Sequence, residues 1–411
     1  MGAGHHPKTI EIADVTFSKD SIFGKFPKFG VPVGILGIGG AIALGQENYQ
    51  FYFSYLTAFM YFLSIALGAL FFVLIQFATR AGWSVVVRRL AEHVMGTLPI
   101  FLVLFVPIIF GMHSLYHWTH AELFDPTSEH FDAIVNGKKG YLNEPFFLIR
   151  AGFYFVTWIL LARYFMKKSF EQDRTGDHQI TVTLQKWSAL GLALYALSQT
   201  FAAFDWMMSL DPHWYSTMYG VYYFAGGFVG IFATLAILTV HLSKGEGVLS
   251  KIANQEHFHD LGKLLFGFTV FWAYIAFSQY FLIWYANIPE ETLFFKYRFS
   301  NGWEPVTILL MVGHFGIPFF LLMSRHMKRH PKVLTGAAIW MLFIHYVDIY
   351  QLVMPNNLAV DRVFAPSIVD LLCFVGVGGF FLAMLGRNLV SAPAVPLKDP
   401  RLPESLAFEN F

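Results

Sequence analysis

The sequence predicts an all-α polytopic membrane protein with ten transmembrane helices. Hydrophobic residues make up 56% of the 411-residue chain and charged residues only 13%, which excludes an ordinary soluble domain. Apolar windows long enough to cross a hydrocarbon layer of ~30 Å as helices recur along the chain. We place the ten spans at 30–45, 51–79, 93–112, 145–166, 185–208, 217–242, 262–287, 303–323, 333–354 and 367–386.

The stretch 204–220, FDWMMSLDPHWYSTMYG, joins two of these spans. We expect a hairpin with a turn of only a few residues, because Pro212 presets its own φ and disfavours a helical conformation for the residue before it. The hairpin places Asp205, Asp211 and His213 at one membrane surface. An acid there is costly unless it is paired, hydrated or functional, so these residues are candidates for a site.

Lysine and arginine are distributed unevenly between the two sets of loops. The loops and tails on the side of the termini hold 22 of the 28, the opposite loops hold five, and Arg150 lies inside a span. The positive-inside rule therefore predicts that both termini are cytoplasmic. The formal net charge is only +1, so the composition gives no sign of the basic surface that binds nucleic acid. Residues 1–29 have no apolar core after a basic start, so we expect a polar arm instead of a secretory signal.

The predicted outward loop 113–144 is acidic, aromatic and rich in histidine. His113 and His117 have the i, i+4 spacing of metal ligands, and His120 follows, but the sequence offers no second ligand cluster. We favour a polar surface that docks a partner protein over a metal site. His113 is therefore a candidate residue of the outer surface.

Cys373 is the only cysteine in the chain. One thiol cannot ligate an iron–sulfur cluster, attach a c-type haem or form an internal disulfide. His314 and His345 could meet and ligate a haem, but b-type haem carriers usually need more than one such pair. We expect no haem, iron–sulfur cluster or metal in this chain, so electron chemistry requires another carrier.

An internal repeat relates the second to fifth spans to the sixth to ninth. Glu144 opens the fourth span just before a proline, and Glu304 opens the eighth in the same way. Asp205 and Asp348 each precede a proline by seven residues. Because an even number of helices separates the copies, they have the same topology and are related by an axis along the membrane normal.

The repeat predicts two four-helix bundles flanked by the first and last helices. Each bundle has one acid at an outward helix start and one near an outward helix end. The predicted segments are a cytoplasmic arm (1–29), the first helix and turn (30–50), the first bundle (51–212), the second bundle (213–355), the tenth helix (356–386) and a cytoplasmic tail (387–411).

In the first bundle, Glu144 and Asp205 should lie at similar depth near the outer surface. Arg150 follows Glu144 about 9 Å further into the membrane by helical rise. Two interpretations stay open for this group. Arg150 and Asp205 form a salt bridge that braces two helices, or the three residues hold a quinol headgroup.

In the second bundle, histidines take the place of the arginine. His345 and Asp348 share a helix face at i, i+3, and the depth of His314 on the preceding helix differs from that of His345 by only ~5 Å. Because chains of acids and histidines inside membranes commonly mark proton paths, we interpret Glu304, His314, His345 and Asp348 as a proton relay. Residues that could extend the relay are Gln279, Tyr280 and Asp370.

Five stretches carry a resemblance to a known family. They are FDWMMSLDPHWYSTMYG (204–220), FSQYFLIWYANIPEE (277–291), LYHW (115–118), RAGWSVVVRR (80–89) and HYVDIYQLVMP (345–355). Through them the chain resembles the NrfD/PsrC-like membrane subunits, and within that family the smaller of the two such subunits of bacterial alternative complex III, a quinol:cytochrome c oxidoreductase. The hairpin motif is the most specific part of the resemblance, which covers nearly the whole chain.

The resemblance implies two four-helix bundles in a bacterial cytoplasmic membrane and no redox cofactor in this chain. Its implied partners are a larger NrfD-like paralogue, an iron–sulfur protein and multihaem c-type cytochromes. The implied role is quinol binding or oxidation with the associated proton transfer. The alternative is a subunit that conducts protons or scaffolds the complex and binds no quinol itself. A stand-alone transporter is disfavoured, because the Pro and Gly interruptions lie mostly near helix ends.

Overall fold

The computed structural model describes residues 11–409, and all regular secondary structure in this range is helical. Nine segments of this range are long and apolar enough to cross a membrane. They are α1 (Ile22–Leu44), α2 (Gln50–Ala78), α3 to α5 (Val85–Phe110), α8 (Glu144–Thr175), α10 (Tyr219–Leu242), α11 (Gln255–Ala286), α13 to α14 (Glu304–Met323), α16 with η7 (Pro331–Asn356) and α17 (Ile368–Leu389).

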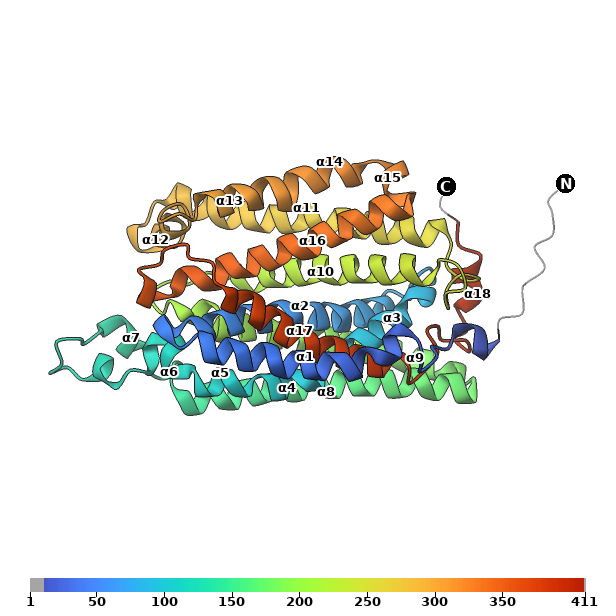
Figure 1. Cartoon of the computed structure of the whole chain (residues 1–411), viewed down its shortest axis with the longest axis horizontal. Coiled ribbons are helices and arrows are strands. Elements are labelled where there is room, and N and C mark those ends of the chain that lie inside the picture. The colour runs from blue at the N-terminus through green and yellow to red at the C-terminus, as the bar shows by residue number, and fades with distance from the viewer. Residues whose placement is uncertain (1–10, 410–411) are drawn as a thin grey trace.

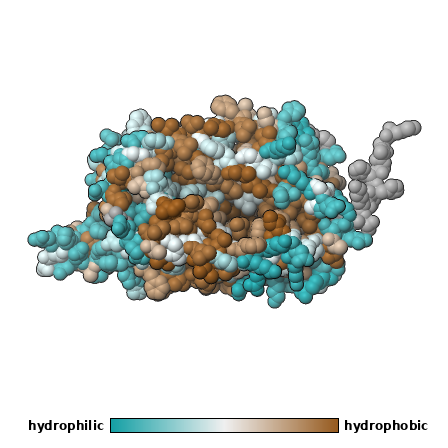
Figure 2. All heavy atoms as spheres, in the orientation of Figure 1, coloured by the Kyte–Doolittle hydropathy of each residue, from teal (hydrophilic) through white to brown (hydrophobic). Residues whose placement is uncertain are grey.

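These helices run side by side along the long axis of the molecule (Figure 1). The surface in Figure 2 is hydrophobic across the middle and hydrophilic at both ends, as a membrane-spanning protein requires. The predicted class, a polytopic α-helical membrane protein, is therefore confirmed. Three of the spans are made of more than one helix. The first consists of α3 (Val85–Met95), α4 (Leu98–Leu104) and α5 (Val106–Phe110). The second consists of α13 (Glu304–Leu310), the π-helix η6 (Met311–Gly316) and α14 (Ile317–Met323), and the third of α16 (Pro331–Val353) and η7 (Met354–Asn356).

A further long helix, α9 (His178–Trp206), coincides with the fifth predicted span. It has 29 residues but is not among the nine apolar segments of the described range. Its first turns carry Gln179, Gln185 and Lys186, which lower its hydropathy. The count of ten transmembrane helices stays a prediction.

α2 is the most enclosed of the nine segments. Of its apolar window 89% is buried, against 22% for α1. It contacts α3, α9, α10, α16 and α17, and its sequence is apolar on nearly every side, as expected of a helix surrounded by other helices. The few polar side chains of α2 therefore face other helices and not lipid.

α1 packs along α17 through glycines on both helices. A Cβ atom at Gly37 would lie 2.7 Å from the Cα of Gly376, and a Cβ atom at Gly379 would lie 2.7 Å from the carbonyl oxygen of Gly30. Small residues allow two membrane helices to approach this closely. The first and last apolar segments of the described range are thus joined.

α1 begins at Ile22, earlier than the predicted start at residue 30. The hydroxyl of Ser21 accepts a hydrogen bond from the N–H of Gly24 (3.3 Å) and caps the helix. The backbone of Phe23 packs so closely on Gly386 of α17 that no side chain fits there, which extends the helix contact into the predicted polar arm. Residues 1–10 of that arm lie outside the described residues.

The turn after α9 is longer than the few residues predicted. α9 ends at Trp206, the short helix η5 (Met208–Leu210) follows, and α10 begins at Tyr219. Trp214 in the turn donates its Nε1–H to the carbonyl oxygen of Glu291 (3.1 Å), and its ring stacks on Phe294. The turn is long because it packs on α12 (Pro289–Arg298), a helix that the prediction treated as part of a loop.

The two described chain ends lie together. Figure 1 places the start of α1 and α18 (Leu402–Leu406) at one end of the molecule, and α7 (Ala133–Gly137) and α12 at the other. The N–H of Ala394 donates to the carbonyl oxygen of Val15 (2.7 Å). The compartment that each end faces stays a prediction. The remaining short helices are η1 (Ile12–Val15), η2 (Glu47–Tyr49), α6 (Met112–Leu115), η3 (His117–Thr119), η4 (Ala121–Phe124), α15 (Arg325–Arg329) and η8 (Leu358–Val360).

The close approach of α1 and α17 predicts that alanine lowers the stability at one glycine of α1 and not at another. Gly37→Ala should lower the thermal stability of the detergent-solubilised protein, because overpacking costs about 1–3 kcal/mol and exceeds the gain in helix propensity. Gly39→Ala is the matched control, since nothing lies within 4 Å of a Cβ atom there. Equal melting temperatures for the two variants would contradict the packing described.

Candidate functional site

Two histidines and an aspartate meet in the interior of the helix assembly. His314 lies on the π-helix η6, and His345 and Asp348 lie on α16. Their potential ligand atoms all lie within 4.8 Å of one another, and none of the three residues is more than 1% exposed. We call these three residues the His–Asp cluster.

Side chains from two further helices hold Asp348. The hydroxyl of Tyr222 on α10 and the Nε1–H of Trp272 on α11 donate to its two carboxylate oxygens, the latter at 3.0 Å. The Trp272 ring also stacks on the His314 ring, with 3.6 Å between ring centroids. Sequence reasoning missed both residues, because nothing in their spacing links them to α16.

His345 is oriented by α2. Its Nε2 lies 2.8 Å from the hydroxyl oxygen of Ser64, and its ring packs on Tyr61. Gly226 on α10 leaves the space for this arrangement, since a Cβ atom there would lie 2.8 Å from the His345 ring and 3.5 Å from Asp348. The cluster is therefore built from the second predicted bundle together with α2.

Three nitrogens of the cluster have no hydrogen-bond partner in residues 11–409: both ring nitrogens of His314, and Nδ1 of His345. Buried polar groups are nearly always paired, and π-helices occur often at functional sites, so unpaired nitrogens on a π-helix indicate a function. Two imidazoles and a carboxylate can exchange protons, and they are also a donor set that a divalent metal can use.

Glu304, the fourth member of the predicted relay, is not joined to the other three. It opens α13, is exposed, and lies about 15 Å from His314 by helical rise. Asp370 is not a member of the cluster either, and its carboxylate accepts hydrogen bonds from Ser54, Gln50, Tyr350 and the N–H of Ser367. A relay that includes either residue would need further groups between them and the cluster.

Arg150 and Asp205 of the first predicted bundle form a two-point salt bridge. Arg150 Nε lies 2.7 Å from Asp205 Oδ2, and Nη2 lies 2.9 Å from Oδ1. The hydroxyl of Tyr154 donates to Oδ2 at 2.7 Å, and Arg150 Nη1 donates to the carbonyl oxygen of Tyr141 at 2.9 Å. Both carboxylate oxygens are therefore engaged. Glu144 opens α8, is exposed, and makes no hydrogen bond to this pair within the described range.

The remaining candidates lie at the end of the molecule that carries α7. His213 Nε2 lies 2.5 Å from Asp132 Oδ2, and Asp211 lies 3.8 Å from Arg362. The His113 ring stacks on the His120 ring, with 4.0 Å between centroids. Asp205 is buried in α9, so the hairpin does not bring it to the same surface as Asp211 and His213.

A buried ion network near the opposite end was missed by the sequence analysis. Arg88 Nη2 lies 2.5 Å from Asp399, Arg89 Nη2 lies 2.7 Å from Asp173, and Arg89 Nε lies 2.8 Å from Glu92. Residues 80–92 lie between two of the predicted spans, yet Arg88, Arg89 and Glu92 are all buried. The spacing of the two arginines before Glu92 was the available signal, whereas nothing local marks Asp399 as a partner.

Arg150→Ala is expected to lower the free energy of unfolding by about 3–5 kcal/mol, because it leaves the buried Asp205 carboxylate unpaired. Thermal unfolding of the detergent-solubilised protein measures this change. The double variant Arg150→Met with Asp205→Leu removes both charges and should lose less stability than Arg150→Ala alone. If the loss of stability in the double variant equals the sum of the losses for Arg150→Met and Asp205→Leu measured singly, the two side chains are not energetically coupled.

The hydrogen bonds of Asp132 predict how the stability of the loop around α7 depends on pH. Burial raises the pKa of Asp132, but hydrogen bonds from Val135, His213 and Ile134 and the charge of His213 outweigh it, so the pKa lies below its usual value. Stabilisation by Asp132 is thus present above the ordinary aspartate pKa of about 4 and is lost as the pH falls through the lower, folded-state pKa.

Limited proteolysis of residues 121–137 should therefore accelerate as the pH falls below about 4. Asp132→Asn should accelerate cleavage already at pH ~6 and remove most of this pH dependence. Glu129→Gln, which removes a nearby carboxylate, is the control and should behave as the unmodified protein. The same pH profile for both variants would exclude Asp132 as the responsible group.

The polar groups of the interior thus include a two-point salt bridge, an ion-pair network and the His–Asp cluster. Comparison of the chain with protein-family models and with curated proteins gives no match. The resemblance carried by the sequence motifs stays a prediction, and the function has to be argued from the site itself.

Proposed function

We propose that this chain is an integral membrane subunit of a quinol:electron-acceptor oxidoreductase, similar to alternative complex III, and that its His–Asp cluster handles protons released by quinol oxidation. The observation that supports this most is the set of three unpaired, fully buried nitrogens beside the carboxylate of Asp348. Oxidation of a quinol to a quinone releases two protons, which need acceptors within hydrogen-bond reach.

The chemistry of the cluster suits this role. Histidine takes up and releases protons near neutral pH, and ionisable side chains inside a membrane commonly belong to proton paths. No lysine or arginine stands among the groups that hold Asp348, in contrast to the pairing of Asp205 with Arg150. A fixed positive charge would hold the carboxylate ionised, whereas neutral neighbours leave it able to exchange a proton.

The proposal also covers the number and grouping of the transmembrane helices, the partner subunits and the membrane. We infer that α9 is a tenth transmembrane helix and that two groups of four spans form bundles. The contacts of α8 with α4 and α9 and of α10 with α11 and α16 support the grouping, whereas α2 contacts helices of both groups. The proposed partners are a larger paralogous subunit, an iron–sulfur protein and multihaem cytochromes, in a bacterial cytoplasmic membrane with both termini cytoplasmic.

A second candidate is a subunit that conducts protons or scaffolds the complex and binds no quinol. One observation favours it: the Arg150–Asp205 pair, which we considered for the quinol headgroup, has both carboxylate oxygens occupied. A quinol at this site would have to displace a charged hydrogen bond inside a low-dielectric environment, which costs more than an ordinary polar contact.

Asp348→Asn tests the proposed role in the assembled complex, reconstituted into vesicles. It should leave assembly intact and slow quinol oxidation and proton release by about tenfold or more, because it removes a positioned proton acceptor. Asp177→Asn is the matched control: Asp177 caps α9 at a helix end, and asparagine caps equally well.

Normal rates for Asp348→Asn in both assays would overturn the proton-handling role. Metal analysis of the same preparations separates the two chemistries that the donor set allows. One equivalent of a divalent metal, lost in Asp348→Asn, would favour a metal centre over a proton site.

A further inference from the structure

The ring of His345 carries its free lone pair on one identifiable nitrogen. The hydroxyl of Ser64 donates to the carbonyl oxygen of Tyr61 (2.6 Å), so at the 2.8 Å contact with His345 Nε2 the Ser64 oxygen accepts and the ring N–H donates. The proton of the neutral imidazole is therefore on Nε2, and Nδ1 has the lone pair. A Cβ atom at Gly226 would lie 3.0 Å from this Nδ1 and 3.5 Å from Oδ2 of Asp348. The lone pair and the carboxylate thus border the same small space.

His314 and Asp348 also have acceptor positions left. Neither ring nitrogen of His314 has a hydrogen-bond partner in residues 11–409, and a neutral imidazole has a lone pair on one of the two. Asp348 accepts one hydrogen bond at each carboxylate oxygen, from Tyr222 and from Trp272. A carboxylate offers about four acceptor positions, so two remain. The Asp370 carboxylate, in contrast, accepts four hydrogen bonds and has no position left.

The three potential ligand atoms are close to the spacing that a metal ion needs. They lie within 4.8 Å of one another, whereas two ligands of a tetrahedral Zn²⁺ are about 3.3 Å apart at bond lengths of ~2.0 Å. Shifts of about 1 Å per side chain would close this difference. His345 and Asp348 share one face of α16, and His314 comes from the π-helix η6, a kind of element that is frequent at functional sites.

The donor set selects the kind of cation. Two imidazoles and one carboxylate are the protein ligands of many zinc sites that keep a fourth position open. Mg²⁺ and Ca²⁺ prefer oxygen ligands throughout, and Fe²⁺ and Mn²⁺ bind such sites more weakly than Zn²⁺ does. One carboxylate leaves one positive charge uncompensated, so binding should be weaker than at structural zinc sites with four protein ligands.

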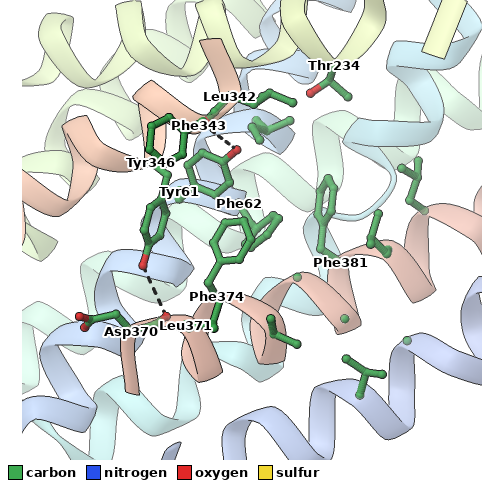
Figure 3. A pocket seen from close by; sticks show the side chains of 18 of the residues that line it. Tyr61, Phe62, Thr234, Leu342, Phe343, Tyr346, Asp370, Leu371, Phe374 and Phe381 are labelled. Atoms are coloured by element: carbon green, nitrogen blue, oxygen red, sulfur yellow. Dashed lines mark hydrogen bonds between the residues drawn. The ribbon is translucent and has the colours of Figure 1, made fainter. Parts of the chain in front are cut away.

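The packing around the cluster determines how fast a cation can enter. An apolar groove of about 1190 Å³ lies beside it, and Figure 3 shows Tyr61 in the lining, with its hydroxyl bonded to the carbonyl oxygen of Leu342 (3.1 Å). The Tyr61 ring packs on His345, with 5.4 Å between centroids, and Trp272 covers the His314 ring. A cation therefore enters only when this packing opens locally, and binding should be slow.

We propose that the His–Asp cluster is a binding site for Zn²⁺, ligated by one ring nitrogen of His314, Nδ1 of His345 and a carboxylate oxygen of Asp348. The cation takes the lone pairs that would accept protons, so it blocks the cluster and acts as a reversible inhibitor. The effect on turnover rests on the proposed function, whereas the binding site does not. The chain purified with a chelator stays free of metal, as expected from the sequence.

Binding is measured on the full chain, purified in detergent, treated with a chelator and then incubated with Zn²⁺. One equivalent should remain after unbound metal is removed, and it should be taken up over minutes instead of on mixing. Co²⁺ in place of Zn²⁺ should give the visible absorption of cobalt with four ligands. Mg²⁺ at the same concentration should not compete.

Three variants locate the bound cation. His314→Gln removes a ligand and should abolish the slow uptake. Ser64→Ala leaves all three ligands in place but removes the acceptor that fixes the tautomer of its histidine, and should weaken binding by about tenfold or more. His120→Gln is the control for surface binding, because the His120 ring stacks on His113 and its Nδ1 lies 4.0 Å from Glu122. It should keep the slowly bound equivalent.

An equivalent that is lost in His120→Gln and kept in His314→Gln would overturn the assignment to the cluster. A metal that co-purifies with the chain and resists the chelator would also overturn the inhibitory role, since the cluster would then be a resident metal centre. Unchanged affinity in Ser64→Ala would exclude the proposed tautomer of His345 and with it Nδ1 as the ligand.

Turnover of the complex reconstituted into vesicles separates this inference from the proposed function. Zn²⁺ should slow quinol oxidation with the same time course as binding, and Ser64→Ala should raise the inhibitory concentration about tenfold, in step with its weaker binding. Slow binding at the cluster with unchanged turnover would support the metal site and overturn proton handling by the cluster. Absence of binding together with slow turnover in Asp348→Asn would overturn the metal site alone.

Discussion

Each ionisable side chain inside the apolar layer has to find its partners within the protein, because lipid supplies none. Arg150 and Asp205 meet this constraint with two direct contacts. Arg88, Arg89, Glu92, Asp173 and Asp399 meet it as a network of ion pairs, in which Arg89 Nη1 still has no hydrogen-bond partner among the described residues. The His–Asp cluster meets it only in part, since neither ring nitrogen of His314 has a hydrogen-bond partner among the described residues and the ring stacks on Trp272. Selection for stability alone would favour apolar residues at such positions.

The two aspartates that the sequence repeat pairs, Asp205 and Asp348, have opposite surroundings. Asp205 is fixed by a guanidinium and a tyrosine, whereas Asp348 receives hydrogen bonds only from neutral donors, Tyr222 and Trp272. A fixed cation suits the bracing of two helices. Neutral donors favour the ionised carboxylate less strongly than a fixed cation does, which suits a group that changes its protonation.

The sequence was a good guide to the spans and to some of the buried polar pairs. The long apolar runs, the shared face of His345 and Asp348, and the salt bridge considered for Arg150 and Asp205 could be predicted, because they depend on helical periodicity and on the cost of burying charge. The meeting of His314 with His345 was anticipated from their similar depth, although depth does not determine rotation about the helix axis.

Other features depend on contacts that no local pattern encodes. The early start of α1 depends on glycines of α17, and the long turn after α9 depends on its packing against α12. An apolar groove lined by residues of α1, α2, α10, α16 and α17 likewise depends on the packing of α1 mainly against α17. Trp272 and Tyr222 became part of the site through the rotation of α10 and α11, which sequence spacing leaves undetermined.

The pairing of Arg88 with Asp399 also has a consequence for how the protein is made. Arg88 lies on α3, one of the first helices to leave the ribosome, and its buried partner is near the other end of the chain. Close to Arg88 in the sequence, the carbonyl oxygen of Trp83 accepts a hydrogen bond from the hydroxyl of Ser405, and the N–H of Val86 donates one to it. Until these last residues are translated, Glu92 on its own helix is the ion-pair partner of Arg88, and the second carboxylate, Asp399, is still missing. Completion of this buried ion network is therefore a late step of biosynthesis, and loss of the segment after α17 would remove one of the two carboxylates that pair with Arg88.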